Sequence, residues 1–304
     1  MHLWETLRWA HEDREVLHSA EKYAVSVQEE CAYFMQAGFA QNAARTDAYS
    51  AGPDNGWRYR FEQLPVHDAL LNAYKLGEIA GQGGTFTRAL RLMDWFCAHT
   101  CYCGMEIRAA YRFQGKKEDG LRILRYAYDG GFAHAINCRH KAFVFADCLI
   151  AAGIWAIPIA MGSFTYRPGE ADVTPRTSHF VVHAWLPEEA RWVMLDPSMN
   201  TYVIDEEDRA LHLIEIHECR RRGEPLRLAR YDFNGTQDHR EHYLQGFILS
   251  SLLEMFLRDG TDRQKSGPRN RLLPEDVPQK DKTTRAITAT ELLAEPIMKE
   301  VVGL

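Results

Sequence analysis

Long apolar runs are missing from this chain of 304 residues. No stretch approaches the roughly 18 consecutive apolar residues of a membrane-spanning helix, and the N-terminus lacks the charged-then-apolar pattern of a secretory signal. An excess of positive charge is missing too, because the formal net charge is -6 and the pI is about 6.1. We therefore expect neither a membrane nor nucleic acid as the main partner.

Cysteine spacing that would indicate disulfides or a metal site is also missing. Seven cysteines are an odd number without framework spacing, which is typical of free thiols in a reducing, cytoplasmic protein. Cys97, Cys101 and Cys103 lie close together beside His99, but a structural zinc site needs a second ligand pair that the chain does not offer. No phosphate-binding loop and no EF-hand loop is present. We predict no metal and no cofactor.

One cysteine begins a predicted helix. Asn137 suits the N-cap position before Cys138, and Gly153 suits the position just after the C-cap. Nearly all residues between them are apolar apart from Arg139, His140 and Lys141, which indicates a buried helix. Unpaired backbone N–H groups, the helix dipole and these neighbouring cations favour a thiolate in the first turn. The alternative is a small buried side chain without reactivity.

The segment 179–197 is typical of a β-hairpin whose turn is Pro187–Ala190. The register places Trp185 opposite Trp192 and His183 opposite Met194, so Asp196 lies diagonal to His183 on the same face. Diagonal neighbours are about 7–8 Å apart at the backbone, within reach of a hydrogen bond between a carboxylate and an imidazole. The pattern also fits an ordinary hairpin with a satisfied polar pair.

These two segments together resemble the transglutaminase-like superfamily of papain-type cysteine enzymes, over about residues 84–205. The residues that carry the resemblance are Cys138 with Ala142, Gly153 and Ile154, then His183-Ala184-Trp185, Trp192 and Asp196-Pro197. The resemblance implies Cys138 as nucleophile, His183 as general base and then acid, and Asp196 as the residue that orients it. Ile136 stands where the family usually has glycine, and Trp155-Ala156-Ile157 replaces the usual Pro-Ala-Arg, which puts the shape of the acyl pocket in doubt.

Further residues are candidates for supporting roles. The oxyanion would be bound by the backbone N–H of Cys138 and by a side chain on the preceding helix, for which Trp95 or Tyr102 is available. Both aromatics could equally be core residues. His179 points to the same side of its strand as His183 and could replace it as base, but lacks the His-Ala-Trp context. We expect His179, Trp155 and Trp185 to line the cleft.

The expected fold is α+β. A papain-like or transglutaminase-like core at 64–205 would pack a buried helix, with the cysteine at its N-terminus, on a small antiparallel sheet. Helical extensions are expected at 1–63 and 206–304, with helices near 206–219 and 243–258 and a polar linker at 259–285.

The expected function is acyl transfer from a peptide, protein or small amide through a thioester on Cys138. Water as acceptor would make the protein a peptidase or amidase, and this outcome is favoured because no calcium-binding loop is evident. An amine as acceptor would make it a transglutaminase-type acyltransferase. A transglutaminase-like scaffold without catalysis is the third possibility.

Overall fold

A computed structural model describes residue 49 and residues 54–102, 119–165, 174–235, 240–252, 254–258, 261, 269–273 and 284–298. Most of the expected N-terminal helical extension, 1–63, therefore lies outside the described residues. Cys103 and most of the expected linker, 259–285, lie outside them as well.

The described residues form a mixed α+β structure, as predicted. The α-helices are α4 (Pro65–Tyr74), α5 (Leu76–Ala80), α6 (Thr85–His99), α8 (Gly120–Ala127), α9 (Cys138–Ala151), α10 (Leu213–Arg222), α11 (Arg240–Tyr243) and α12 (Ala289–Leu293). Shorter helical turns are the 3₁₀ turns Gly131–His134 and Leu249–Ser251 and the π-helical turn Leu244–Ile248. The strands are β1 (Arg60–Phe61), β2 (Ala156–Thr165), β3 (Thr174–Leu186), β4 (Arg191–Leu195), β5 (Val203–Ile204), β6 (Arg227–Leu228), β7 (Glu254–Arg258), β8 (Arg269–Leu272), β9 (Thr284–Ala286) and β10 (Ile297–Met298).

Six strands form the central sheet in the order β4-β3-β2-β7-β8-β9. Its neighbours are antiparallel except β8 and β9, which run parallel. The C-terminal part of the chain is thus not a purely helical extension, because β7, β8 and β9 continue the sheet that β2 begins. The predicted helix 243–258 ends early, and residues 254–258 pair with β2 and β8 as a strand.

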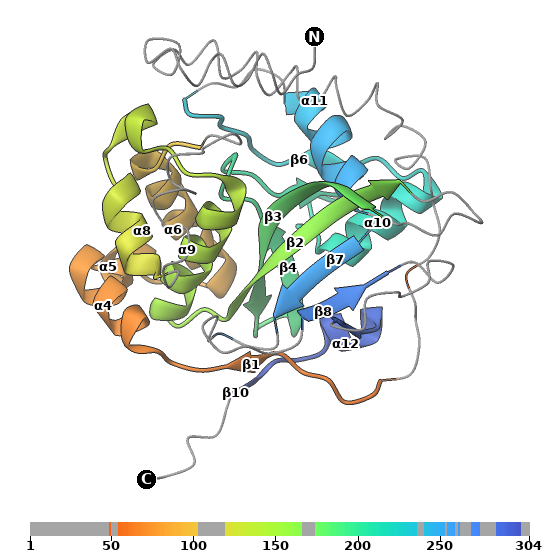
Figure 1. Cartoon of the computed structure of the whole chain (residues 1–304), viewed down its shortest axis with the longest axis horizontal. Coiled ribbons are helices and arrows are strands. Elements are labelled where there is room, and N and C mark those ends of the chain that lie inside the picture. Colours follow the sequence, from red (N-terminus) through yellow and green to blue (C-terminus); the bar gives the residue numbers. More distant parts are fainter. Residues whose placement is uncertain are drawn as a thin grey trace.

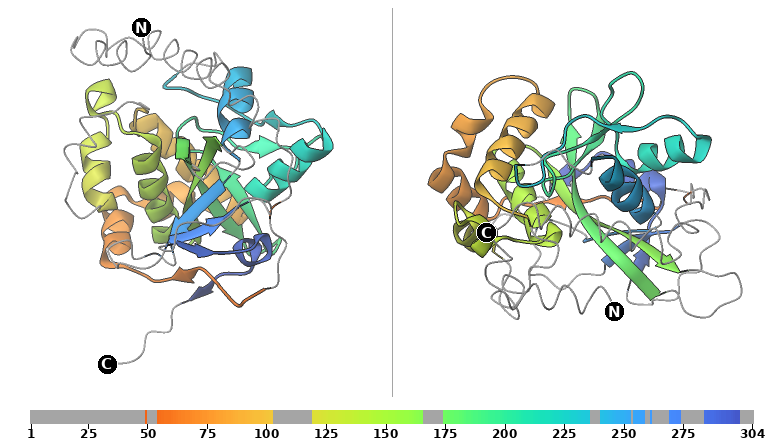
Figure 2. Two further views of the ribbon diagram at one scale, coloured as in Figure 1. Left: turned by 45° about the vertical axis from the view of Figure 1, so that its right-hand side comes forward. Right: turned by 90° about the horizontal axis from the view of Figure 1, so that it is seen from above.

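The cysteine helix lies between the sheet and the other helices. Helix α9 contacts β2 and β3 on one side and α4, α6 and α8 on the other, and Figures 1 and 2 show these helices on one side of the sheet, with α10 and α11 on the other side. Almost all residues of α9 are buried, as its apolar sequence predicts. Removal of this apolar surface from water is the main source of stabilisation for such a layer.

Both ends of α9 form where the sequence predicts them. The Asn137 side chain accepts a hydrogen bond from the backbone N–H of His140 at 3.1 Å, which makes it the N-cap. At the other end Gly153 has a φ of 79°, and Gly153 N and Ile154 N donate to the carbonyls of Ile150 and Leu149. This is a Schellman motif, in which glycine tolerates the left-handed backbone. Cys138 is thereby the first residue of the helix.

The hairpin register is also confirmed. Trp185 pairs with Trp192 and His183 pairs with Met194, and the turn falls at 187–190. On the other side of β3, Ala184 pairs with Ala156 and His179 pairs with Met161. His179 and His183 are four residues apart, which corresponds to about 13 Å along the strand.

The two ends of the described chain meet in a second, small sheet. Arg60 pairs with Ile297 and Phe61 with Met298, so that β1 and β10 run parallel. Within the described residues, no helix has both the length and the apolar character needed to cross a lipid bilayer.

Candidate active site

The N-terminus of α9, strand β3 and the turn after β4 bring a thiol, an imidazole and a carboxylate together. Cys138 is partly exposed, whereas the His179 and Asp196 side chains are fully buried. Nε2 of His179 lies 2.8 Å from Oδ2 of Asp196, and the Cys138 thiol interacts with the same ring. A thiol, an imidazole and a carboxylate are therefore arranged in series, as a cysteine nucleophile with an oriented base requires.

The histidine in this cluster is His179, which corrects the predicted pairing of His183 with Asp196. Extending the confirmed register by one residue places Asp196 opposite Val181, so that both histidines are diagonal neighbours of the carboxylate. The right-handed twist of a sheet brings one diagonal pair together and separates the other. The close pair here is His179 and Asp196.

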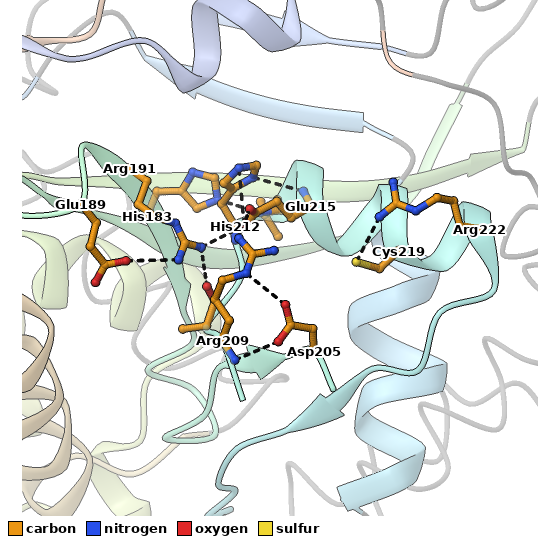
Figure 3. A network of polar contacts seen from close by, with 11 residues as sticks. His183, Glu189, Arg191, Asp205, Arg209, His212, Glu215, Cys219 and Arg222 are labelled. Atoms are coloured by element: carbon orange, nitrogen blue, oxygen red, sulfur yellow. Dashed lines mark hydrogen bonds and ion pairs between the residues drawn. The ribbon is translucent and has the colours of Figure 1, made fainter. Parts of the chain in front are cut away.

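His183 occupies a different environment at the start of α10. Its Nε2 accepts a hydrogen bond from the backbone N–H of Leu213 at 3.2 Å, and its ring faces Trp192 and His212. Figure 3 shows this ring beside His212, next to the ion pairs that Glu215 makes with Arg191 and Arg209. Burial, followed by the charge of His212, holds the pKa of His183 well below its ordinary value. His183 is a neutral acceptor for a helix N-terminus.

The electrostatics of His179 are opposite to those of His183. Burial alone would lower its pKa, but the charge and hydrogen bond of Asp196, together with the interaction with Cys138, raise the pKa of His179 to about 10. Burial would raise the pKa of Asp196, but the interactions with His179 and hydrogen bonds from Tyr243 and Ser198 N hold it below its ordinary value. The folded protein therefore favours an imidazolium beside a carboxylate.

An ionised carboxylate only accepts hydrogen bonds, so Nε2 of His179 is the protonated ring nitrogen that faces Asp196. Nδ1 remains as the ring nitrogen available to the Cys138 thiol. Proton transfer from Cys138 to Nδ1 gives a thiolate beside an imidazolium, which is the reactive form of a cysteine nucleophile.

The other described cysteines lie in sites that favour the neutral thiol. Burial raises the pKa of Cys97 to about 11, raises that of Cys101, and holds that of Cys148 well above its ordinary value. Burial and a hydrogen bond with Glu224 raise the pKa of Cys219 to about 11. Cys138 differs from these four because it is the one in contact with His179.

The cations that follow Cys138 do not all face the thiol. Lys141 is buried, and its Nζ donates to the carbonyl of Thr100 at 3.0 Å and lies over the Phe96 ring. Burial lowers the pKa of Lys141. Its charge interacts with Cys97, Cys101 and Asp196. The Arg139 guanidinium lies over Phe143. The contact with His179, rather than these cations, distinguishes the Cys138 environment.

The two candidates for an oxyanion donor occupy different places. Ring contacts of Trp95 are with Tyr74, His99 and Tyr128, a cluster between α4, α6 and the end of α8. Tyr102 instead forms a backbone bridge with Ile136, two residues before the nucleophile. The Trp95 ring is partly buried in this aromatic cluster, and its role as oxyanion donor stays a prediction.

Trp155 and Trp185 lie at the end of the β2–β3 ladder remote from His179. Trp185 N donates to the carbonyl of Trp155 at 2.9 Å, and the Trp155 ring stacks on Phe61 at 5.3 Å. Trp185 packs edge-on against Trp192. Their predicted position in the cleft is wrong, because both tryptophans lie far along the strand pair from the Cys138–His179 contact.

Cys97, near the end of α6, lies beside the segment that carries Asp196, whereas a cavity beside β1 and β10 does not belong to this site. Cys97 Sγ donates to the carbonyl of Pro197 at 3.1 Å. A cavity of about 540 Å³ lies beside β1 and β10 and involves no residue of the cluster. It is lined by Asn55, Gly56, Trp57, Arg58, Arg60, Arg285, Ala286, Glu291 and Ile297.

Sequence reasoning missed one residue of the cluster, Tyr243. Its hydroxyl donates to Oδ2 of Asp196 and lies 2.9 Å from Nε2 of His179. Tyr243 lies in α11, outside the segment that carries the family resemblance, and a single tyrosine at the start of the helix predicted near 243–258 gives no pattern signal.

Comparison with protein-family models, with curated proteins and with solved structures found no match for this chain. The geometry of the Cys138 site is therefore the basis for a functional proposal.

Proposed function

We propose that this protein is a cysteine-dependent acyl-transfer enzyme with a papain-like or transglutaminase-like core, acting on a peptide, protein or small amide. The observation that carries the proposal is the contact of Cys138 with His179 and of His179 with Asp196 at the start of a buried helix. Cys138 is the nucleophile, His179 the base and acid, and Asp196 the residue that orients the imidazole.

The first half-reaction is acylation. The Cys138 thiolate attacks the substrate carbonyl carbon, and the carbonyl π electrons move to oxygen to form an oxyanion. That oxyanion is placed to accept a hydrogen bond from the Cys138 backbone N–H, one of the unpaired donors at the helix N-terminus. The oxyanion then re-forms the carbonyl while the C–N bond breaks. The leaving nitrogen takes the proton of His179 Nδ1, and a thioester remains.

The second half-reaction returns the enzyme to its starting state. Nδ1 of His179 removes a proton from the acceptor as the acceptor attacks the thioester carbon, and the C–S bond breaks to restore the thiolate. Water gives a carboxylic acid, and a primary amine gives a new amide. We favour hydrolysis, because water is present at very high concentration and an amine competes with it only where the protein holds the amine close to the thioester.

Selective alkylation tests the nucleophile without a known substrate. Brief iodoacetamide treatment near neutral pH followed by peptide mapping is expected to label Cys138 first, because the pKa values of Cys97, Cys101, Cys148 and Cys219 are raised. Cys101→Ser is the matched control and should leave labelling of Cys138 unchanged. Uniform labelling of all thiols would contradict the proposal and support a scaffold without catalysis.

The fate of the acyl group separates the two enzyme classes. Peptide and amide libraries incubated with and without a primary amine, and analysed by mass spectrometry, should yield mainly free acid. Intact-mass analysis should show an acyl adduct on the wild type and none on Cys138→Ala. Amine incorporation that saturates, depends on amine structure and exceeds hydrolysis would instead identify a transferase.

A further inference from the structure

We infer that Tyr243 is a positioning residue that holds Asp196 in place and thereby presents His179 to Cys138. The inference rests on the proposed function and extends it, because Tyr243 comes from a part of the chain beyond β4 and beyond the family resemblance. The catalytic constellation then has a fourth member, supplied by the C-terminal part of the chain.

Three donors surround the Asp196 carboxylate. Its Oδ2 accepts from the Tyr243 hydroxyl and from His179 Nε2, and its Oδ1 accepts from Ser198 N at 2.9 Å. All three side chains, those of His179, Asp196 and Tyr243, are fully buried. A buried carboxylate with three donors is stable as an anion and has little freedom to rotate. The anion fixes the proton on Nε2 and leaves Nδ1 for the thiol.

The Tyr243 ring is itself held by its neighbours. It stacks on Phe247 at 5.4 Å, and Phe247 packs edge-on against His179 at 5.0 Å. The first residue of α11, Arg240, donates through its guanidinium to the carbonyl of Leu228 in β6. Tyr243 therefore reaches Asp196 from a short helix that is tied to the body of the protein.

Other titratable groups face the same carboxylate and tyrosine. Cys97 of α6 and Lys141 of α9 interact with the charge of Asp196. Tyr102 and Tyr231 lie near the Tyr243 hydroxyl, whose pKa is held well above its ordinary value by burial and by the charge of Asp196. Tyr243 is thus a neutral donor, and Tyr243→Phe leaves these other groups in place.

The test is the pH dependence of Cys138 alkylation in the full chain with iodoacetamide as probe, a readout that a purely structural role would not change. In Tyr243→Phe, Asp196 loses one donor and takes up a proton more easily. On acidification, the Asp196 carboxylate, whose charge stabilises the His179 imidazolium, is then protonated at a higher pH. We expect the midpoint at which Cys138 loses reactivity on acidification to rise by about one pH unit.

Two further variants sharpen the test. Tyr231→Phe removes a hydroxyl from a neighbouring buried tyrosine whose ring lies 5.6 Å from that of Tyr243, and it should leave the midpoint unchanged. Arg240→Ala alters an exposed residue and loosens α11, so it should move the midpoint in the same direction by a smaller amount. Arg240→Ala also keeps the inference testable if Tyr243→Phe fails to fold.

The outcomes separate this inference from the proposed function. Wild-type Cys138 could be labelled selectively while neither Tyr243→Phe nor Arg240→Ala shifts the midpoint at which reactivity is lost on acidification. That result would overturn the role of Tyr243 alone. An equal shift in Tyr231→Phe would also overturn it. Absence of selective Cys138 labelling in the wild type would instead overturn the proposed function.

Discussion

Two histidines on one face of β3 are in opposite chemical states. His179, in the middle of the strand, contacts a carboxylate and a thiol, and its pKa rises to about 10. His183, four residues further along, accepts a backbone N–H and faces a second histidine, and its pKa falls well below the ordinary value. Both rings are fully buried. The partner of each ring, and not the extent of burial, determines whether the site suits proton transfer.

The largest expected effect follows from removing the imidazole that contacts the thiol. His179→Ala should lower turnover by about 10³-fold, because general acid–base catalysis contributes about 10²–10⁴-fold. It should lower the rate of Cys138 alkylation at neutral pH by about 30-fold, because a thiol without its base remains a few per cent thiolate. His183→Ala should leave both rates within a few-fold of the wild type. The reverse pattern would restore the assignment of His183 as base and contradict the contact between His179 and Asp196.

The next largest effect concerns the charge beside His179. Asp196→Asn keeps a hydrogen-bond acceptor but removes the anion, which should lower turnover about 100-fold through a loss of about two pKa units of imidazolium stabilisation. Asp205→Asn, which changes a carboxylate that pairs with Arg209 and not with His179, is the matched control. The two variants differ in effect only if the contact between His179 and Asp196 supports catalysis.

The dependence of stability on pH should report on His212, the histidine that faces His183 at the start of α10. Burial lowers the pKa of His212 to about 4, below the unfolded value of 6.5, so the unfolded state takes up the proton first as the pH falls. The free energy of unfolding should therefore be unaffected by His212 above about pH 6.5 and should fall by about 3 kcal/mol between pH 6.5 and 4. Urea denaturation at several pH values measures this loss.

His212 is also the N-cap of α10, so a control variant can keep the cap and remove only the titrating group. In His212→Asn the side chain still caps the helix but no longer titrates, so the contribution of His212 to the pH slope should vanish while stability near neutral pH is retained. An unchanged slope would show that His183 or other groups account for the acid sensitivity.

The smallest effect is the loss of an acceptor for one backbone N–H. His183→Leu leaves Leu213 N without its partner and should lower the free energy of unfolding by about 1–3 kcal/mol. His183→Gln supplies another acceptor and should cost less. Equal stability of the leucine variant and the wild type, by chemical denaturation, would indicate that the hydrogen bond from Leu213 contributes nothing.

Much of the local structure was predictable from the sequence, because local rules determine it. Capping by Asn137 and the left-handed Gly153 set the ends of α9, and alternating residues with a short turn set the register of Trp185 and Trp192. The choice between His179 and His183 was not predictable, because both are diagonal to Asp196 in that register and only the twist of the sheet distinguishes them. The motif His183-Ala184-Trp185 favoured the histidine that is remote from Cys138.

Long-range contacts account for the remaining differences. Residues 254–258 contain both apolar and charged residues, and their assignment as strand β7 depends on the edge of β2 that they cover. Tyr243 contributes through a contact with Asp196, a residue 47 positions away in the chain. No periodic pattern carries such information, because the partners are specified by the fold as a whole.

The position of β7 beside β2 determines how late in synthesis the site can be completed. A ribosome emits the N-terminal part of a chain first, at about 5–20 residues per second, so α9, β2, β3 and β4 leave it well before β7. Until residues 254–258 emerge, β2 lacks its partner strand β7. Until residue 243 emerges, Asp196 lacks the hydrogen bond from Tyr243. The nascent chain therefore carries Cys138 for some seconds before the site around it is complete. Full thiol reactivity in ribosome-bound chains should appear only after the C-terminal third has been made.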